Sequence, residues 1–554
     1  MIQSKYTNNI KIHYLVPTRI VSSSKADNTS HLLSDTPPQA VLGNTNVCRI
    51  SEGGYVLLDI GAEICGGIEI TSMRAENFPP LFRLVFGESV SEAMSDIGVK
   101  NATNDHSPRD FTFRGAGFGN LRLGQTGFRF VRIEVLEGDM NISGVRGASE
   151  LRDIEYKGTF ECDDELLNQI WHTAARTVHL NMQNYLWDGI KRDRLVWIGD
   201  MHAEVSAIMG IFGYNDVVEK SLDLIKEYTP TDKWMNNIPS YSFWWLIIRH
   251  DWYMYTGNSE YVIKDGKYIC DMTSHILDSI SDDGTDDFTS VMQNEDENNP
   301  YMNYFIDWET LGTPDSKSGF YAVAIIALNA CRTLCEVIGD KTLAEKCANK
   351  IEKIRSFDLP DIYEKQAAAL SVLADMKDAE EINEKILSRE PVADITAYLG
   401  YYLLLAKAKA GDVAGAIDII KLYWGRMIEL GATSFWESFN YPSSFDAAPI
   451  DDFVPEGKKD IHGDFGAYCY KGFRCSLCHG WACGPAPFIT KCVLGVEILE
   501  PGCKRVRVKP NLRNLRFIKG TYPTPYGNIE IYAENKNGEI ITQINAPDGV
   551  IVER

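Results

Sequence analysis

The spacing of apolar residues changes twice along this chain of 554 residues. Before about Leu151, glycines and turn residues separate short runs in which apolar and polar residues alternate, such as GYVLLDI and GFRFVRIEVLEG. After Asp163 apolar residues recur every three or four positions, and beyond Pro501 the alternating runs return. Alternation is typical of strands, and the longer period is typical of amphipathic helices. The sequence therefore predicts a β, then α, then β order.

The middle part contains about a dozen predicted helices, in segments such as FWWLIIRHDWYMYTG and GFYAVAIIALNACRTLCEVIG. A dozen helices in antiparallel pairs would suit a closed (α/α)6 barrel. We therefore predict an N-terminal β-sandwich accessory domain over residues 1–155, a catalytic barrel over 156–495 and a C-terminal β-sandwich over 496–554.

Composition excludes several classes of partner. Acidic residues outnumber basic ones by 77 to 55, and the resulting net charge of -22 leaves no basic field for nucleic acid or anionic membranes. The first twenty residues lack a continuous apolar core, and no later run approaches the roughly 18 apolar residues of a spanning helix. The 13 cysteines, an odd number, favour reduced buried thiols over a secreted disulfide framework. We expect a cytoplasmic protein that binds a small molecule.

The densest group of functional side chains lies in NYLWDGIKRDRLVWIGDMHAE, residues 184–204. Its carboxylates are Asp188, Asp193, Asp200 and Glu204, and they lie among Trp187, Trp197, Lys191, Arg192 and Arg194. Sugar sites use carboxylates for proton transfer and hydroxyl binding, and flat rings for the apolar faces of the sugar. Taken alone, such a stretch is more often a solvated loop whose charges form surface ion pairs.

A second cluster favours the sugar site. In GATSFWESFN, residues 431–440, Glu437 follows Trp436 at the end of another predicted hairpin, and two such clusters can face each other across the mouth of a barrel. Two further segments, FIDWETLG and SLCHGWACGP, add Asp307, Trp308, His479 and Trp481. A single histidine is more often a buried structural residue, but within this group His479 is a candidate hydrogen-bond partner for a sugar hydroxyl.

Two motifs that suggest other chemistry have simpler explanations. Cys475, Cys478 and His479 spell the C-x-x-C-H pattern of c-type haem attachment, but that attachment belongs to exported proteins. A zinc site would need a second C-x-x-C pair, so buried free cysteine is the better explanation. The glycine-rich GAGFGNLRLG precedes a strand and opens no helix, which indicates a hairpin turn. We therefore expect neither a metal nor a cofactor.

Taken together, the motifs resemble those of the bacterial α-L-rhamnosidases of glycoside hydrolase family 78. The resemblance depends on DGIKRDRLVWIGD, GATSFWES, SLCHGWACGP and the closing PGCKRVRVKPNL and KGTYPTPYGNIEIY. The N-terminal FGESVSEAMSDIG, NATNDHSPRDF and GQTGFRFVRIEVL are similar to the accessory sandwich that precedes the catalytic barrel of that family. The resemblance spans nearly the whole chain, and several motifs in order are far more specific than any one of them.

The resemblance implies inverting hydrolysis, in which an acid protonates the leaving oxygen and a base activates water on the opposite face of the ring. Matched motif to motif, Asp193 takes the general-acid position and Glu437 that of the general base. The residues implied to line the rhamnose pocket are Asp188, Arg192, Trp197, Asp200, Asp307, Trp308, Trp436 and His479. The expected substrates are small glycosides or oligosaccharides with terminal α-L-rhamnose, and homo-oligomer formation stays open.

Two departures from the family pattern leave alternatives open. Asp193 replaces the usual glutamate and reaches one methylene less far. Either the loop backbone moves inward, or proton donation is weak, or Glu204, one turn after Asp200, takes part. Gly189 and Ile190 stand where Cys and Pro are common, which indicates a divergent branch. A related exo-glycosidase of another sugar, or a carbohydrate-binding pseudoenzyme, is therefore the alternative.

Overall fold

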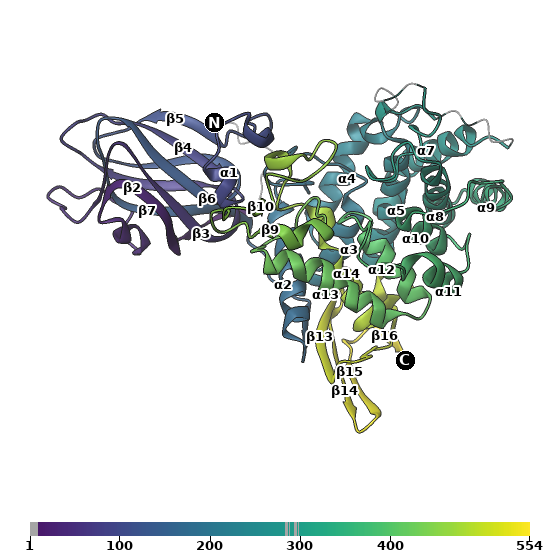
Figure 1. The fold of residues 1–554 in the computed structure, drawn as a ribbon. Coiled ribbons are helices and arrows are strands. Elements are labelled where there is room, and N and C mark those ends of the chain that lie inside the picture. Colours follow the sequence, from purple (N-terminus) through teal and green to yellow (C-terminus); the bar gives the residue numbers. More distant parts are fainter. Residues whose placement is uncertain (1–8, 283–285, 287, 293–295, 297) are drawn as a thin grey trace. The chain divides into compact units, whose positions relative to one another are not determined.

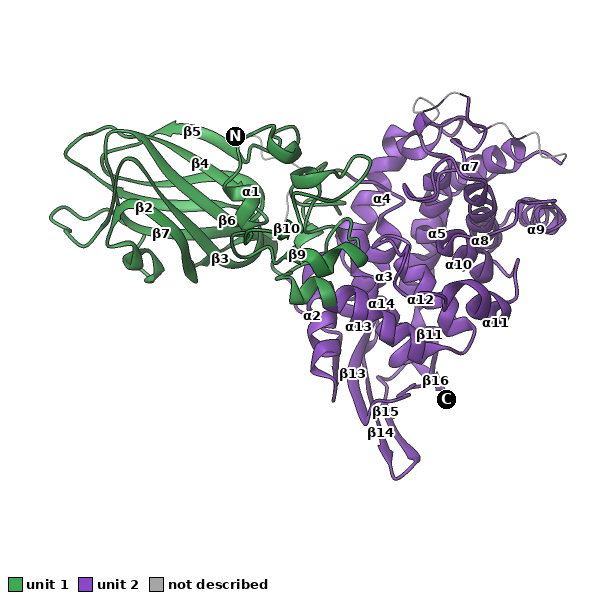
Figure 2. Ribbon diagram, in the orientation of Figure 1, with its two compact units in different colours: residues 1–153, 179–195, 426–479 green, residues 154–178, 196–425, 480–554 purple. Residues whose placement is uncertain are grey.

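The computed structural model describes residues 9–282, 286, 288–292, 296 and 298–554. Residues 1–8, which are part of the segment judged for an export signal, lie outside the described residues. The chain divides into two compact units, each assembled from separate stretches of sequence (Figure 2). Unit 1 comprises Met1–Asp153, His179–Leu195 and Arg426–His479, and unit 2 comprises Ile154–Val178, Val196–Gly425 and Gly480–Arg554. Along the chain, the predicted β, α, β order is confirmed (Figure 1).

One sheet makes up most of unit 1. Its strands follow the order β1-β7-β3-β6-β4-β5, with β2 paired to β3, and all of these pairs are antiparallel. Register shifts after Asp59 and Gly66 interrupt the pairing of the long β3 with β6, and β2 pairs with the part of β3 that ends at Asp59. Such irregularities bend a strand. The strands are β1 (Ile10–Leu15), β2 (Arg19–Asp27), β3 (Cys48–Met73), β4 (Leu81–Gly87), β5 (Asp110–Arg114), β6 (Gly119–Glu137) and β7 (Met140–Arg152).

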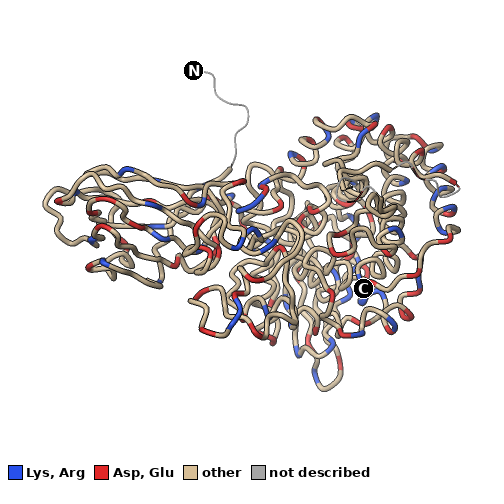
Figure 3. The backbone as a smooth tube through the Cα atoms, turned by 45° about the horizontal axis from the view of Figure 1, so that its top comes forward, with Lys and Arg blue, Asp and Glu red and all other residues tan. Residues whose placement is uncertain are grey.

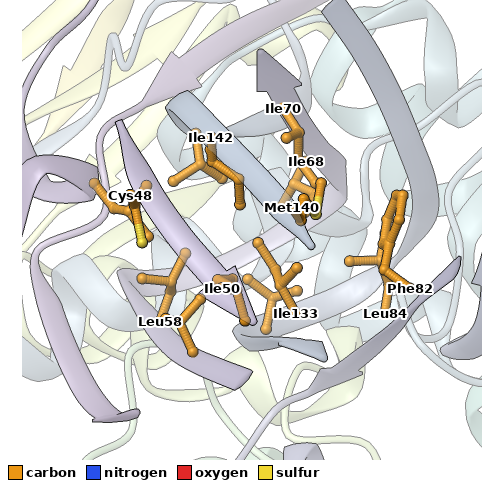
Figure 4. Packing of buried hydrophobic residues seen from close by; sticks show 14 of the residues in the cluster. Cys48, Ile50, Leu58, Ile68, Ile70, Phe82, Leu84, Ile133, Met140 and Ile142 are labelled. Carbon is orange, nitrogen blue, oxygen red and sulfur yellow. The ribbon is translucent and has the colours of Figure 1, made fainter. Parts of the chain in front are cut away.

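The alternating residues of these strands fill an apolar core, part of which is drawn in Figure 4. Ile68, Phe82 and Ile133 belong to this cluster and are fully buried. Each such side chain stabilises the fold by roughly 1.5–3 kcal/mol through burial. Cys48 lies in the same core, where burial raises the pKa of its thiol to about 12. All 13 cysteines are free and most are buried, which agrees with the expectation of reduced thiols.

Unit 1 also carries short elements that belong to the candidate site. The helix α1 (Val90–Ala93) follows β4, and its first amide groups are capped by the Ser89 hydroxyl, which accepts from the Glu92 amide. The strands β9 (Ala447–Ala448) and β10 (Lys459–Asp460) pair in parallel within the last stretch of the unit.

The middle of the chain is helical, as predicted. The long helix α8 contacts α5, α9 and α10, and α10 contacts α12. The helices are α2 (Glu165–Asn181), α3 (Met201–Ile211), α4 (Asp216–Tyr228), α5 (Pro239–Thr256), α6 (Ser259–Lys264), α7 (Gly266–Ser279), α8 (Pro314–Ile338), α9 (Lys341–Arg355), α10 (Lys365–Leu373), α11 (Ala379–Ile382), α12 (Gly400–Lys409), α13 (Val413–Glu429) and α14 (Pro485–Phe488).

One described helix is long and apolar enough to cross a membrane by length and composition alone. Helix α8, Pro314–Ile338, contains an 18-residue window with a mean hydropathy of 1.6, so the expectation that no run approaches this limit was wrong. Of that window, 61% is buried inside the protein, and the core helix of a soluble protein passes the same test. The finding is therefore weak evidence for a membrane span.

Two small sheets follow the helices in unit 2. The first has the order β11-β12-β16 and the second the order β15-β14-β13-β8. Strand β8 precedes all the long helices in sequence but pairs with β13, where Gly520 lies opposite Phe160. The strands are β8 (Thr159–Cys162), β11 (Val496–Ile498), β12 (Arg505–Val508), β13 (Phe517–Thr524), β14 (Gly527–Lys536), β15 (Glu539–Asn545) and β16 (Ile551–Glu553).

Acidic and basic residues are scattered along the backbone of both units (Figure 3). Many of them form ion pairs at the surface, such as Lys220 with Asp216 and Lys267 with Asp271, each one helical turn apart. Exposed pairs of this kind contribute little to stability.

Candidate active site

The candidate acid lies on a short loop of unit 1 that backbone hydrogen bonds close at its base. The Asp188 amide donates to the Leu195 carbonyl at 3.1 Å, and the Leu195 amide donates to Asp188 Oδ1 at 2.9 Å. Within the loop, Asp193 and Arg194 have φ angles of 55° and 58°. Two consecutive non-glycine residues in this region are strained, and such strain occurs at sites where the surroundings fix the backbone. The strained turn determines where the short Asp193 carboxylate is presented.

One guanidinium connects the two candidate catalytic carboxylates. Arg192 Nη2 donates to Glu437 Oε1, and Arg192 Nε lies 3.8 Å from Asp193 Oδ1. Arg192 and Glu437 are 245 residues apart in the sequence. Arg192 and Glu437 are buried, whereas 17% of the Asp193 side chain stays exposed. The structure thus brings the proposed acid and base together around one cation.

Both carboxylate oxygens of Glu437 accept hydrogen bonds. Besides the bond from Arg192 to Oε1, Oε2 accepts a hydrogen bond of 2.9 Å from the Ser476 amide. Burial raises the pKa of Glu437, while Arg192 and the Ser476 amide lower it and the Asp193 charge raises it. A carboxylate whose pKa is raised accepts a proton from water more readily, as a general base must.

His479 lies between two carboxylates as a neutral ring. Its Nε2 is 3.7 Å from Asp188 Oδ2 and 3.8 Å from Glu437 Oε1. Burial lowers the pKa of His479 well below its usual value, and the nearby Arg192 charge adds to this effect. The imidazole therefore stays uncharged near neutral pH and suits hydrogen bonding to a hydroxyl more than charge pairing.

Trp436 offers a buried donor beside Glu437. Its side chain is 2% exposed, and its Nε1 has no hydrogen-bond partner among the described residues. Buried indole N–H groups normally find an acceptor. A hydroxyl oxygen of a bound sugar would supply one.

The remaining acidic candidates lie in unit 2. Tyr241 donates to Asp200 Oδ1 at 2.9 Å, and Thr396 donates to Asp307 Oδ2 at 2.6 Å. Both carboxylates are buried. A Cβ at Gly199 would lie 2.2 Å from the Tyr241 ring, so glycine at this position permits the contact between Tyr241 and Asp200.

Aromatic rings surround these acids within unit 2. The Trp197 ring lies 6.1 Å from Tyr241, which lies 6.1 Å from Phe305, and Phe305 lies 5.5 Å from Trp308. Tyr398 and Trp481 stack at 4.7 Å. Aromatic walls next to carboxylates are suited to binding a sugar ring.

Burial raises the pKa of Asp307 to about 7. Its folded pKa is above its unfolded value near 3.9, so the carboxyl contributes stability at low pH that is lost as pH rises through 7. As the pH rises from 5 to 8, the free energy of unfolding of the wild type should therefore fall. In Asp307→Asn this fall should be smaller, by on the order of 3 kcal/mol. Thermal unfolding measured across this range tests the prediction. The exposed Asp271→Asn variant is the control, and equal pH slopes for the wild type and Asp307→Asn would contradict it.

Glu204, the alternative proton donor, lies on α3 in unit 2 and is fully buried. A Cβ at Gly480 would be only 1.2 Å from Glu204 Oε1, so the carboxylate packs directly on the Gly480 backbone. This position differs from that of Asp193, which keeps an exposed fraction of its side chain.

The sequence candidates thus form two groups. Unit 1 contains Asp188, Arg192, Asp193, Trp436, Glu437 and His479, and unit 2 contains Trp197, Asp200, Asp307 and Trp308. Sequence reasoning missed Ser476, which holds Glu437, and His106, whose Nε2 lies 3.4 Å from Asp193 Oδ1. His106 belongs to a segment that carried the family resemblance, but no motif marks this residue.

The C-x-x-C-H pattern does not form a metal cluster in the described part of the chain. There, one group has metal-ligand spacing, and it consists of Glu88, Glu92 and His462. Cys475 and Cys478 are buried free thiols.

Two family models and one curated relative match parts of the chain. The bacterial α-L-rhamnosidase 6 hairpin glycosidase domain matches residues 155–302, and the bacterial α-L-rhamnosidase C-terminal domain matches residues 495–553. An α-L-rhamnosidase of Formosa agariphila is 23% identical over 211 residues, which are 37% of this chain and 21% of that protein.

Solved structures share the fold. The GH78 family rhamnosidase of Bacillus sp. GL1 has a TM-score of 0.74 and 20% identity, over 95% of this chain and 55% of that one. A rhamnosidase from Klebsiella oxytoca with rhamnose bound has a TM-score of 0.65 and 19% identity, over 87% of this chain and 96% of that one. The chain spans about a fifth of the curated relative and about half of the Bacillus structure. Two parts of the chain, residues 155–302 and 495–553, are therefore similar to bacterial α-L-rhamnosidase domains.

Proposed function

We propose that this protein is an inverting glycoside hydrolase that releases terminal α-L-rhamnose from small glycosides or oligosaccharides. The observation that carries the proposal is the contact of one guanidinium, that of Arg192, with both Asp193 and Glu437. Two carboxylates near each other are the chemical requirement for glycoside hydrolysis. The matched rhamnosidase domains support rhamnose as the sugar.

In the proposed reaction, Asp193 donates a proton to the leaving oxygen while Glu437 removes a proton from the attacking water. An inverting pair needs carboxyl groups about 6.5–9.5 Å apart, so that a water molecule fits beside the sugar. Arg192 keeps Glu437 ionised and fixes its orientation. The Trp436 indole and the neutral His479 ring are proposed to hydrogen-bond sugar hydroxyls.

Several finer features belong to the same proposal. The helices of unit 2 are proposed to pair and close as an (α/α)6 barrel, and the sheets before and after them to form β-sandwiches. Trp197, Asp200, Asp307 and Trp308 are proposed as further sugar ligands. We also propose that the enzyme acts in the cytoplasm on short substrates.

A panel of aryl glycosides that covers several sugars tests the function. Turnover is expected on the α-L-rhamnoside, at least about tenfold faster than on other sugars, with β-L-rhamnose as the first product seen by NMR. Faster hydrolysis of another sugar would favour a related exo-glycosidase instead. Retention of the anomeric configuration would exclude the inverting mechanism.

One observation favours a second candidate, a carbohydrate-binding pseudoenzyme. The acid position carries the shorter aspartate on a strained turn, which can weaken proton donation. Calorimetric binding of L-rhamnose without turnover of any rhamnoside would support this alternative, whereas turnover would exclude it.

A further inference from the structure

We propose that Glu88 and Lys191 position the base Glu437 through the Ser476–Leu477 backbone, so that the N-terminal sheet takes part in catalysis. The inference rests on the proposed function, because it assigns Glu437 as the base. Glu88, Glu92, Lys191, Ser476 and Glu437 all lie in unit 1 and are buried.

The Lys191 ammonium occupies a cage of four oxygens. Its Nζ lies 2.9 Å from Glu88 Oε2 and 3.2 Å from Glu92 Oε1. It also donates to the carbonyl oxygens of Phe473 and Cys475 at 2.8 and 2.7 Å. Glu88 and Glu92 are two of the three side chains whose spacing would suit a metal ion, and both contact the Lys191 ammonium. A buried ammonium persists only when its donors are paired in this way.

Glu88 links this cage to the base. Its Oε2 accepts a hydrogen bond of 2.6 Å from the Leu477 amide, and its Oε1 accepts one of 3.1 Å from the Ser476 hydroxyl. The Ser476 amide donates in turn to Glu437 Oε2, and the Glu437 amide donates to the Ser476 carbonyl at 2.9 Å. Only one residue, Ser476, thus separates the Glu88 carboxylate from the Glu437 carboxylate.

The residues around Glu88 fix its position. It follows the end of β4 and precedes the cap of α1, and its amide donates to Glu92 Oε2 at 2.8 Å. Ser89, the next residue, is hydrogen-bonded to His462 Nδ1 at 2.8 Å. Burial raises the pKa of Glu88 to about 7 and Lys191 opposes this rise, so Lys191 helps to keep Glu88 an acceptor. Residues that hold a reacting group in this way are expected to affect rate more than binding.

The test is Glu88→Gln in the full chain, assayed on an aryl α-L-rhamnoside. Glutamine keeps one acceptor oxygen but loses the second and faces Lys191 without a charge. We expect kcat to fall at least about tenfold while KM changes less than about twofold. The matched control is Glu69→Gln, which removes a buried carboxylate of β3 that pairs with Arg146, and it should leave kcat unchanged.

The pH profile separates positioning from a loss of charge or of stability. If the Ser476 amide moves away from Glu437, the pKa of Glu437 rises and the acid limb of kcat/KM moves to higher pH. If Glu88 acts only by its charge, its removal moves this limb to lower pH. Glu88→Gln substitutes none of the charged or titratable groups that face Glu437. These groups are Lys191, Arg192, Asp193, Cys469, Cys475 and His479.

A milder variant keeps the test valid if Glu88→Gln does not fold. Ser476→Ala removes the hydroxyl bond to Glu88, together with the contacts of this hydroxyl with the carbonyl and the amide of Cys478, but keeps the Ser476 backbone. It should lower kcat about threefold and move the acid limb in the same direction. In the double variant, kcat should fall by less than the product of the two single reductions, because both substitutions act on the same hydrogen-bonded link between Glu88 and Ser476. The inference would be overturned if the reductions in kcat multiplied in the double variant. It would also be overturned if the acid limb of kcat/KM stayed unchanged or moved to lower pH.

The two proposals fail in different ways. If the wild type hydrolyses no rhamnoside, the proposed function is wrong, and a titration of the Glu437 carboxyl by ¹³C NMR still tests positioning. In that measurement Glu88→Gln must raise the Glu437 pKa. If the wild type is active and Glu88→Gln lowers only the Tm, the function stands and the inference fails.

Discussion

Glu437→Gln is expected to lower kcat at least about a thousandfold on every rhamnoside, whatever its leaving group, because attack by water always needs the base. The amide is isosteric with the carboxylate but accepts no proton, and it removes one of the two carboxylates that contact the buried Arg192. Steady-state rates on a series of aryl rhamnosides with phenols of different acidity measure this effect. The loss should be equal along the whole series.

The control for this variant is Glu429→Gln, which changes an exposed glutamate at the end of α13 that pairs with Arg426 at the surface. It should keep the wild-type rate. Circular dichroism and the Tm of both variants show whether the fold is intact. Residual activity above about a tenth of wild type in a folded Glu437→Gln protein would remove Glu437 from the role of base.

Asp193→Asn is expected to show the second-largest effect, and one that depends on the leaving group. Poor leaving groups need protonation, so kcat should fall about a hundredfold or more on alkyl rhamnosides and disaccharides. Acidic phenols depart with little protonation, so their rates should fall less than about tenfold. A plot of log kcat against the leaving-group pKa should therefore be steeper for Asp193→Asn than for the wild type.

Glu204→Gln provides the comparison that assigns the acid. Glu204 is enclosed against the Gly480 backbone, and its replacement should affect stability and leave the leaving-group dependence unchanged. Suppose that log kcat of Glu204→Gln depends more steeply on the leaving-group pKa, while Asp193→Asn lowers kcat equally on all substrates. Then Glu204 is the acid and the assignment of Asp193 is wrong.

Local patterns in the sequence were sufficient for the order of the elements. The alternation in GFRFVRIEVLEG and the helical period of GFYAVAIIALNACRTLCEVIG are properties of single segments, and both segments adopt the predicted structure as parts of β6 and α8. The same local information was insufficient for the membrane test, because the apolar residues of α8 do not reveal whether protein or lipid surrounds them. The pairing of β8 with β13 was also unpredicted, since the two strands are separated by the whole helical part.

For the candidate site too, the sequence predicted some features and the tertiary structure decided others. The sequence by itself identified Asp193, Arg192 and Glu437 as chemically suitable residues, because their types and motifs are local. Only the tertiary structure decided that Arg192 contacts both carboxylates, that Ser476 holds Glu437 and that Lys191 lies in a cage of oxygens. The physical reason is that most of these contacts join separate segments of the chain, from the 39 residues between Glu437 and Ser476 to the 245 residues between Arg192 and Glu437 and the 284 between Lys191 and Cys475. Hydrogen bonds and desolvation depend on which segments meet, and no periodicity within one segment specifies its partner.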